Sequence, residues 1–80
     1  MSQETRPLDA LNQSKGKRVI VKLRSHGGKN EEGEMIGILK AFDLHLNLWL
    51  EDAELVVGDS KTKLGTVVLR GDNILFISPE

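Results

Sequence analysis

The sequence predicts a mostly β domain, in which one short N-terminal helix precedes about five short strands of a strongly bent antiparallel sheet or small open barrel. Three observations predict this class. Apolar residues before Gly16 have helical spacing, and after Gly16 they alternate with polar residues, as in half-buried strands. Turn-forming residues separate the alternating segments at short intervals. At 80 residues, the chain predicts one domain over residues 1–80.

The first segment is predicted to be a flexible start over residues 1–5 and a helix over residues 6–15. Leu8 and Leu11 share one face of this helix, and Gly16 can end it. About ten residues do not stay helical alone in water. We therefore expect the two leucines to dock the helix onto the sheet.

Five segments with strand character follow over residues 17–79. They are KRVIVKLR, EMIGILKAF, LWLEDAELVV, KLGTVVLR and NILFIS. Gly37 interrupts the second segment, and a glycine inside a strand marks a sharp bend or a close backbone approach. Gly71 and Asp72 lie between the last two segments and predict a hairpin that joins them.

Length and cysteine content predict an oligomer. A chain this short buries only about 60% of the surface that its unfolded form exposes, so a lone monomer is marginally stable. Small domains are usually reinforced by disulfides, a metal or oligomerisation. The chain has no cysteine, and His26 and His45 lie far apart, which argues against a structural zinc site. Oligomerisation is therefore the expected remedy.

Charge and aromatic content limit how the chain can bind nucleic acid. The formal net charge is −1, which argues against a protein that binds phosphates indiscriminately. It does not argue against recognition of bases in small pockets. Phe42, Trp49 and Phe76 are too few for a broad stacking platform. We expect Trp49 to pack in the core or between subunits.

No apolar run reaches the roughly 18–20 residues that a membrane span needs, and the polar N-terminus lacks a signal-peptide core. These features predict a soluble, cytoplasmic protein with no membrane partner. The lack of cysteine is compatible with a reducing compartment.

The stretch AFDLHLNLWLEDAE, residues 41–54, contains the candidate functional residues. Its apolar positions alternate with Asp43, His45 and Asn47, which form either the solvated face of a strand or part of a binding site. Asp43 and Asp72 could also be read as a metal or acid–base pair, although aspartates in turns more often cap their own backbone. No nucleophile–base arrangement stands out, so we expect no catalysis and no cofactor.

Two motifs extend the interpretation beyond composition. The first is GILKAFDLHLNLWLEDAE, with the pattern G-x5-D-x-H-x-N, and the second is LGTVVLRGDNILFISP. Together, in this order and after a short helix, they closely resemble the two Sm motifs of the Sm and Sm-like family. The short chain is most similar to archaeal Sm-like proteins, and the resemblance covers roughly residues 6–79.

The resemblance implies an N-terminal helix on a five-stranded, strongly bent antiparallel sheet, the Sm fold. It also implies a ring, usually of seven subunits, in which the fourth strand of one subunit pairs with the fifth strand of its neighbour. Those strands would be approximately residues 62–70 and 73–78. A ring of six subunits is the alternative to a ring of seven. The implied activity is binding of uridine-rich single-stranded RNA at the central pore, and a protein-interaction ring with unused RNA pockets is the alternative.

Site roles are likewise implied by the resemblance, position by position. His45 would stack on a uracil, Asn47 would recognise its Watson–Crick edge, and Arg70 would stack from the other side, from the neighbouring subunit. Gly71 would allow close backbone approach. The aspartates at positions 43 and 72 would orient Asn47 and the loops. The family also places a tight loop around residues 43–46, where alternation alone predicts a continuous strand.

The loop over residues 25–33 is longer than the family's usual turn. Arg24, His26 and Lys29 could add an RNA contact there. A tolerated surface insertion is the favoured interpretation, because three nearby glutamates offset the positive charge and a longer loop costs little closure entropy.

Overall fold

The computed structural model describes residues 7–24 and 33–80. The predicted flexible start and most of the long loop, residues 25–32, lie outside the described residues. The described elements, in chain order, are α1 (Pro7–Gln13), β1 (Arg18–Leu23), β2 (Gly33–Phe42), β3 (Leu48–Val57), β4 (Ser60–Leu69), the 3-10 turn η1 (Gly71–Asn73) and β5 (Ile74–Pro79). One helix followed by five strands confirms the predicted class.

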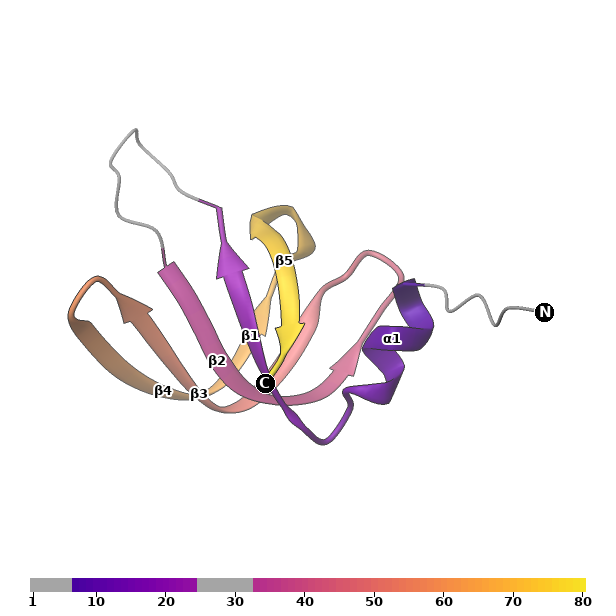
Figure 1. Cartoon of the computed structure of the whole chain (residues 1–80), viewed down its shortest axis with the longest axis horizontal. Helices are drawn as coiled ribbons and strands as arrows, with labels where there is room; N and C mark the ends of the chain where they lie inside the picture. Colours follow the sequence, from indigo (N-terminus) through magenta and orange to yellow (C-terminus); the bar gives the residue numbers. More distant parts are fainter. Residues whose placement is uncertain (1–6, 25–32) are drawn as a thin grey trace.

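The five strands form a single antiparallel sheet in the order β4-β3-β2-β1-β5. The predicted hairpin between β4 and β5 is wrong, because these two strands lie at opposite edges of the sheet (Figure 1). The sheet bends so strongly that η1 carries the chain from one edge to the other, where β5 pairs with β1. The backbone N–H of Arg24 donates to the carbonyl of Asn73 at 2.7 Å and fixes this crossing.

The bend is centred on β2 and β3, which curve together through the molecule (Figure 1). Their register shifts between Ile36 and Ile38, around Gly37. A Cβ atom on Gly37 would lie 3.1 Å from the carbonyl oxygen of Glu51, so any side chain here would force the two strands slightly apart. Opposite, Asp52 adopts a left-handed backbone with φ of 53°. The predicted bend at Gly37 is therefore confirmed.

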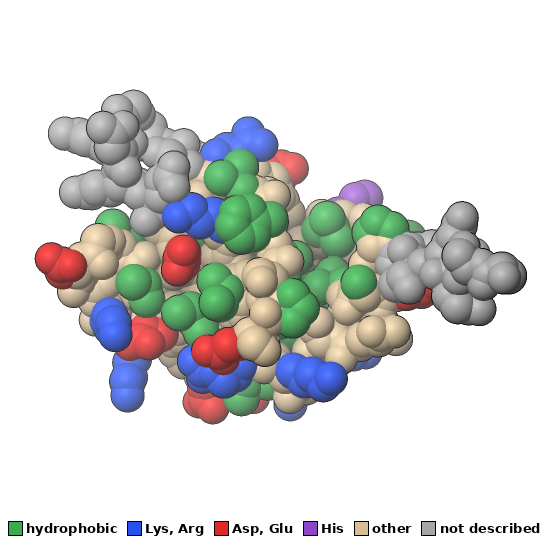
Figure 2. All heavy atoms as spheres, viewed as in Figure 1, with side chains coloured by type: hydrophobic (Ala, Val, Ile, Leu, Met, Phe, Trp, Pro, Cys, Tyr) green, Lys and Arg blue, Asp and Glu red, His purple; other side chains and the backbone are tan. Residues whose placement is uncertain are grey.

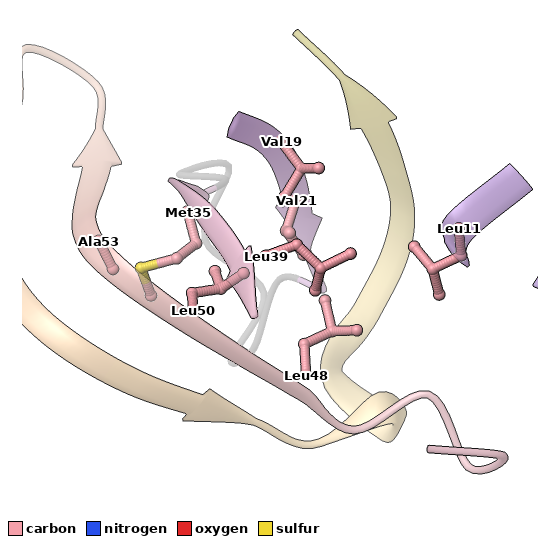
Figure 3. Packing of buried hydrophobic residues seen from close by; sticks show 8 residues of the cluster. All are labelled: Leu11, Val19, Val21, Met35, Leu39, Leu48, Leu50 and Ala53. Carbon is pink, nitrogen blue, oxygen red and sulfur yellow. The ribbon is translucent and has the colours of Figure 1, made fainter. Parts of the chain in front are cut away.

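The core fills the concave side of the sheet (Figure 3). Alternate residues of the strands supply it, as the period-two pattern predicts. Its buried apolar members are Leu11, Val19, Val21, Met35, Leu39, Leu48, Leu50 and Ala53. Leu11 is the contribution of α1, so the predicted docking of the helix through this residue is confirmed.

The helix is shorter than predicted, because the chain leaves helical geometry after Gln13 and turns through residues 14–16. Gly16 takes a left-handed backbone with φ of 82° and donates its N–H to the carbonyl of Leu39 at 2.7 Å. Leu8, the other leucine expected to dock the helix, is 37% exposed and does not join the core; it lines an apolar groove of about 260 Å³ between α1 and β5. Within the described parts of the chain, no helix has the length and apolar character needed to cross a bilayer.

Candidate nucleic-acid interface

Residues 43–47 form a tight loop between β2 and β3. The backbone N–H of Asp43 donates to the carbonyl of Asn47 at 3.2 Å, and the N–H of Leu46 donates to the carbonyl of Asp43 at 3.0 Å. Leu46 has a φ of 62°, a left-handed conformation that a leucine adopts only when its surroundings impose it. The loop that the family resemblance implies is therefore present, and the continuous strand expected from alternation is wrong.

The Asp43 carboxylate organises this loop. Its Oδ1 accepts hydrogen bonds from the backbone N–H groups of His45, at 2.9 Å, and Asn47, at 3.1 Å. Its Oδ2 accepts a hydrogen bond from the Asn47 side-chain Nδ2 at 3.0 Å. An aspartate that bonds to N–H groups just after it is the usual Asx turn. Here the same carboxylate also fixes a neighbouring side chain.

These bonds stabilise the charged form of the carboxylate. The side-chain hydrogen bond from Asn47, followed by that residue's backbone N–H, lowers the pKa of Asp43 below its ordinary value of 3.8. Desolvation opposes the shift, and the backbone N–H and the charge of His45 add to it. Asp43 is therefore ionised at neutral pH and acts there only as an acceptor.

The 3-10 turn η1 closes against the same loop. The backbone N–H of Gly71 donates to Asn47 Oδ1 at 2.9 Å. A Cβ atom on Gly71 would overlap the carbonyl oxygen of His45 and lie 3.1 Å from that of Leu46. Only glycine lets η1 come this close. The turn and the loop therefore meet through one hydrogen bond and direct backbone contact.

Asn47 is consequently held at both ends of its amide. The Gly71 donor identifies the atom facing it as oxygen, and the Asp43 acceptor identifies the other as nitrogen. A primary amide has two donor hydrogens and two acceptor lone pairs. One of each is used inside the subunit. One N–H and one lone pair, in a fixed relative position, are left for a ligand.

The remaining predicted site residues lie on the same two segments. His45 is exposed in the loop, Arg70 is exposed at the end of β4, and Asp72 is exposed in η1. In the described structure Asp43 is hydrogen-bonded to Asn47 and Asp72 is not. Of the two aspartates predicted to orient Asn47, only Asp43 is therefore in contact with it. Stacking by His45 and Arg70 stays a prediction.

Residues 7–24 and 33–80 contain no group of three histidine, cysteine or acidic side chains placed to hold a metal ion. The surface shown in Figure 2 carries basic and acidic side chains intermixed with apolar ones. On this face, the described basic side chains form no continuous positive surface.

Trp49 lies next to the site residues; its expected position in the core is wrong, and its expected position between subunits stays a prediction. Its side chain is 42% exposed, so it lies outside the subunit core. It lines an open hollow with Asp43 and Asn47, on the outer face of the sheet. The signal was present in the sequence, because Trp49 follows Asn47 by two residues and strand alternation places both on one face.

Comparison with known proteins agrees with this geometry. Residues 9–79 match the LSM domain family. The chain belongs to this family. A relative from Archaeoglobus fulgidus, named as an snRNP Sm-like protein, is 47% identical over 75 residues, which cover 92% of this chain and 90% of the relative. The resemblance to Sm-like proteins inferred from the two motifs is confirmed.

Solved structures similar to this LSM domain include ring assemblies. The SmAP1 heptamer of P. aerophilum is 46% identical with a TM-score of 0.84, covering 99% of this chain and 97% of that one. The Pyrococcus abyssii Sm protein in complex with a uridine heptamer is 39% identical with a TM-score of 0.82, covering 94% and 99%. Both share the helix and bent five-stranded sheet, which confirms the Sm fold.

Proposed function

We propose that this LSM domain is a non-enzymatic RNA-binding protein. It assembles into a ring that holds uridine-rich single-stranded RNA at the central pore, one recognised base per subunit. The observation that carries this proposal is the Asn47 amide, fixed between Asp43 and Gly71 with one donor and one acceptor left over. The uridine complex of the similar Pyrococcus abyssii protein supports it.

Ring assembly is supported by the edges of the sheet. In the described structure β4 and β5 are the two edge strands of the sheet, so each pairs with a neighbouring strand on one side only. Exposed strand edges favour pairing with another chain. A head-to-tail contact between β4 of one copy and β5 of the next satisfies both edges when it closes into a ring. Seven subunits are proposed, as in the P. aerophilum heptamer, with six as the alternative.

Uracil suits the free part of the Asn47 amide. Its N3–H donates and its neighbouring carbonyl oxygen accepts, which matches the free lone pair and the free N–H of Asn47. Cytosine has an acceptor at N3 beside an amino donor, the reverse order. An amide that could rotate would accommodate either base. Because Asp43 and Gly71 fix the amide, only one order fits.

The base also needs contacts with its two faces. In this proposal His45 and Arg70 supply them, since imidazole and guanidinium groups stack on bases, and Arg70 acts from the neighbouring subunit. Each pocket alone is weak. One strand that occupies several pockets gains about 10²–10⁴ in affinity through effective concentration. The ring is therefore expected to bind long oligo-U far more tightly than uridine monophosphate.

The test is a fluorescence-anisotropy titration with labelled ten-nucleotide oligo-U and oligo-C, at low and moderate salt. Wild type is compared with Asn47→Ala, and Asn12→Ala on the exposed surface of α1 is the matched control. Tight oligo-U binding that is weak for oligo-C and lost only in Asn47→Ala supports the proposal. Equal binding of both oligomers contradicts base recognition. No binding at all indicates a protein-interaction ring instead.

We also propose a cellular context, RNA processing or ribonucleoprotein assembly in the cytoplasm. The cysteine-free composition fits a reducing compartment. Crosslinking RNA to the protein in cells and sequencing the bound fragments tests this context, and uridine-rich sites should predominate.

A further inference from the structure

Trp49 is held on the outer face of the sheet by its neighbours in β3. Leu48 and Leu50 are almost completely buried on the opposite face, with exposures of 1% and 0%. Side chains alternate along a strand, so Trp49 cannot enter the core without removing both leucines from it. The indole is therefore a fixed, partly exposed aromatic surface.

Trp49 and Asn47 both line an open hollow of about 250 Å³. Asn47 and Trp49 lie two residues apart along the chain, or about 7 Å at the usual strand rise. The cross-strand partners of Trp49 are Ala41 and Val68. Ala41 is small and leaves room beside the ring.

The chemistry of the hollow favours a nucleobase over a phosphate. The residues that line the hollow include Asp43, whose negative charge disfavours phosphate nearby, and include no lysine or arginine. The apolar side chains and the indole instead offer a flat, apolar surface. Bases stack on exposed aromatic side chains in single-strand-binding proteins.

We propose that Trp49 stacks on the base of the nucleotide adjoining the one recognised by Asn47. This inference rests on the proposed function, since it extends the path of the same RNA strand. In this proposal the RNA leaves the protein loop at residues 43–47 and continues across the outer face of β3. Stacking is tolerant of sequence because every base has a π-face, so this second position accepts any base.

Intrinsic fluorescence tests the contact directly, because Trp49 is the single tryptophan and the chain has no tyrosine. Unlabelled ten-nucleotide oligo-U is titrated into the assembled wild-type protein while indole emission is recorded. We expect emission to be quenched in step with binding. In parallel anisotropy titrations, Trp49→Val should weaken oligo-U binding by about tenfold or more, whereas Trp49→Phe, which keeps an aromatic face, should bind nearly as wild type.

The results separate this inference from the proposed function. If wild type binds oligo-U without a change in emission, and Trp49→Val binds equally well, the inference is overturned and the proposed function stands. Iodide, which quenches exposed indoles by collision, is added to the RNA-free ring as a second measurement. If it does not quench Trp49, a second copy covers the indole, and the inference is also overturned. If wild type binds no oligo-U, the proposed function fails first. If Trp49→Val does not fold, wild-type emission still decides, because quenching in step with binding supports the inference and unchanged emission overturns it.

Discussion

The Oδ1 atom of Asn47 accepts a 2.9 Å hydrogen bond from the backbone N–H of Gly71, which lies 24 residues further along the chain. The contact joins the loop between β2 and β3 to the turn between β4 and β5. It sets the orientation of the Asn47 amide, together with the Asp43 carboxylate on its other side. The orientation of the amide is thus fixed by the fold itself.

Asn47→Asp should abolish base recognition while preserving the shape of the side chain. The new carboxylate loses the N–H that donates to Asp43 and places two negative charges against each other. We expect oligo-U affinity to fall by at least about tenfold per pocket. Anisotropy titration measures it, and Asn12→Asp on α1 is the charge-matched control. Equal losses in both variants would mean that net charge, not the amide, governs binding.

Gly71→Ala should disrupt the junction of the two loops. The added methyl group overlaps the carbonyl oxygen of His45, so η1 or the loop must move. We expect a loss of about 1–3 kcal/mol in the free energy of unfolding, measured by urea denaturation, together with weaker oligo-U binding. Gly33→Ala is the control, because its nearest neighbour would be 3.5 Å away. A Gly71→Ala protein as stable as Gly33→Ala would contradict the close approach.

The loop at residues 43–47 should lose its hydrogen bonds to the Asp43 carboxylate in acid, when this group becomes protonated. Because the pKa of Asp43 is lowered in the folded state, its stabilising contribution is complete above the ordinary value of 3.8 and is lost as pH falls through the lower folded value. We therefore expect oligo-U affinity to show no Asp43-dependent change between neutral pH and about pH 5. Carbon-detected NMR of the carboxylate gives the midpoint. A midpoint above 3.8 would contradict the hydrogen-bond network.

Much of the fold follows from local signals in the sequence. Alternation of apolar residues places Val19, Val21 and Leu50 in the core, and Gly37 marks the bend of the sheet. These features depend on strand geometry and on the missing side chain of one residue. Each can be recognised within a window of a few residues.

The pairing of the strands does not follow from local signals. Gly71 and Asp72 correctly predict a turn, but whether the flanking strands pair depends on the curvature of the whole sheet. Here the curvature sends β5 to β1. For the same reason, spacing in the sequence cannot show that Asn47 meets Gly71, and the resemblance to Sm-like proteins implied only that both residues belong to one site. For Trp49, alternation with the buried Leu48 and Leu50 already points away from the core, so of its two expected positions only the contact between subunits stays a prediction.

The partition of leucines between core and surface gives a final test of the fold. Leu50 is completely buried, whereas Leu44 is 80% exposed in the loop. Leu50→Ala should lower the free energy of unfolding by about 2–5 kcal/mol, because the core cannot collapse around the lost atoms. Leu44→Ala should change it by less than about 0.5 kcal/mol. Urea denaturation at one fixed protomer concentration measures both, since assembly adds to apparent stability. Similar losses at the two positions would show that Leu44 is covered in the assembled protein.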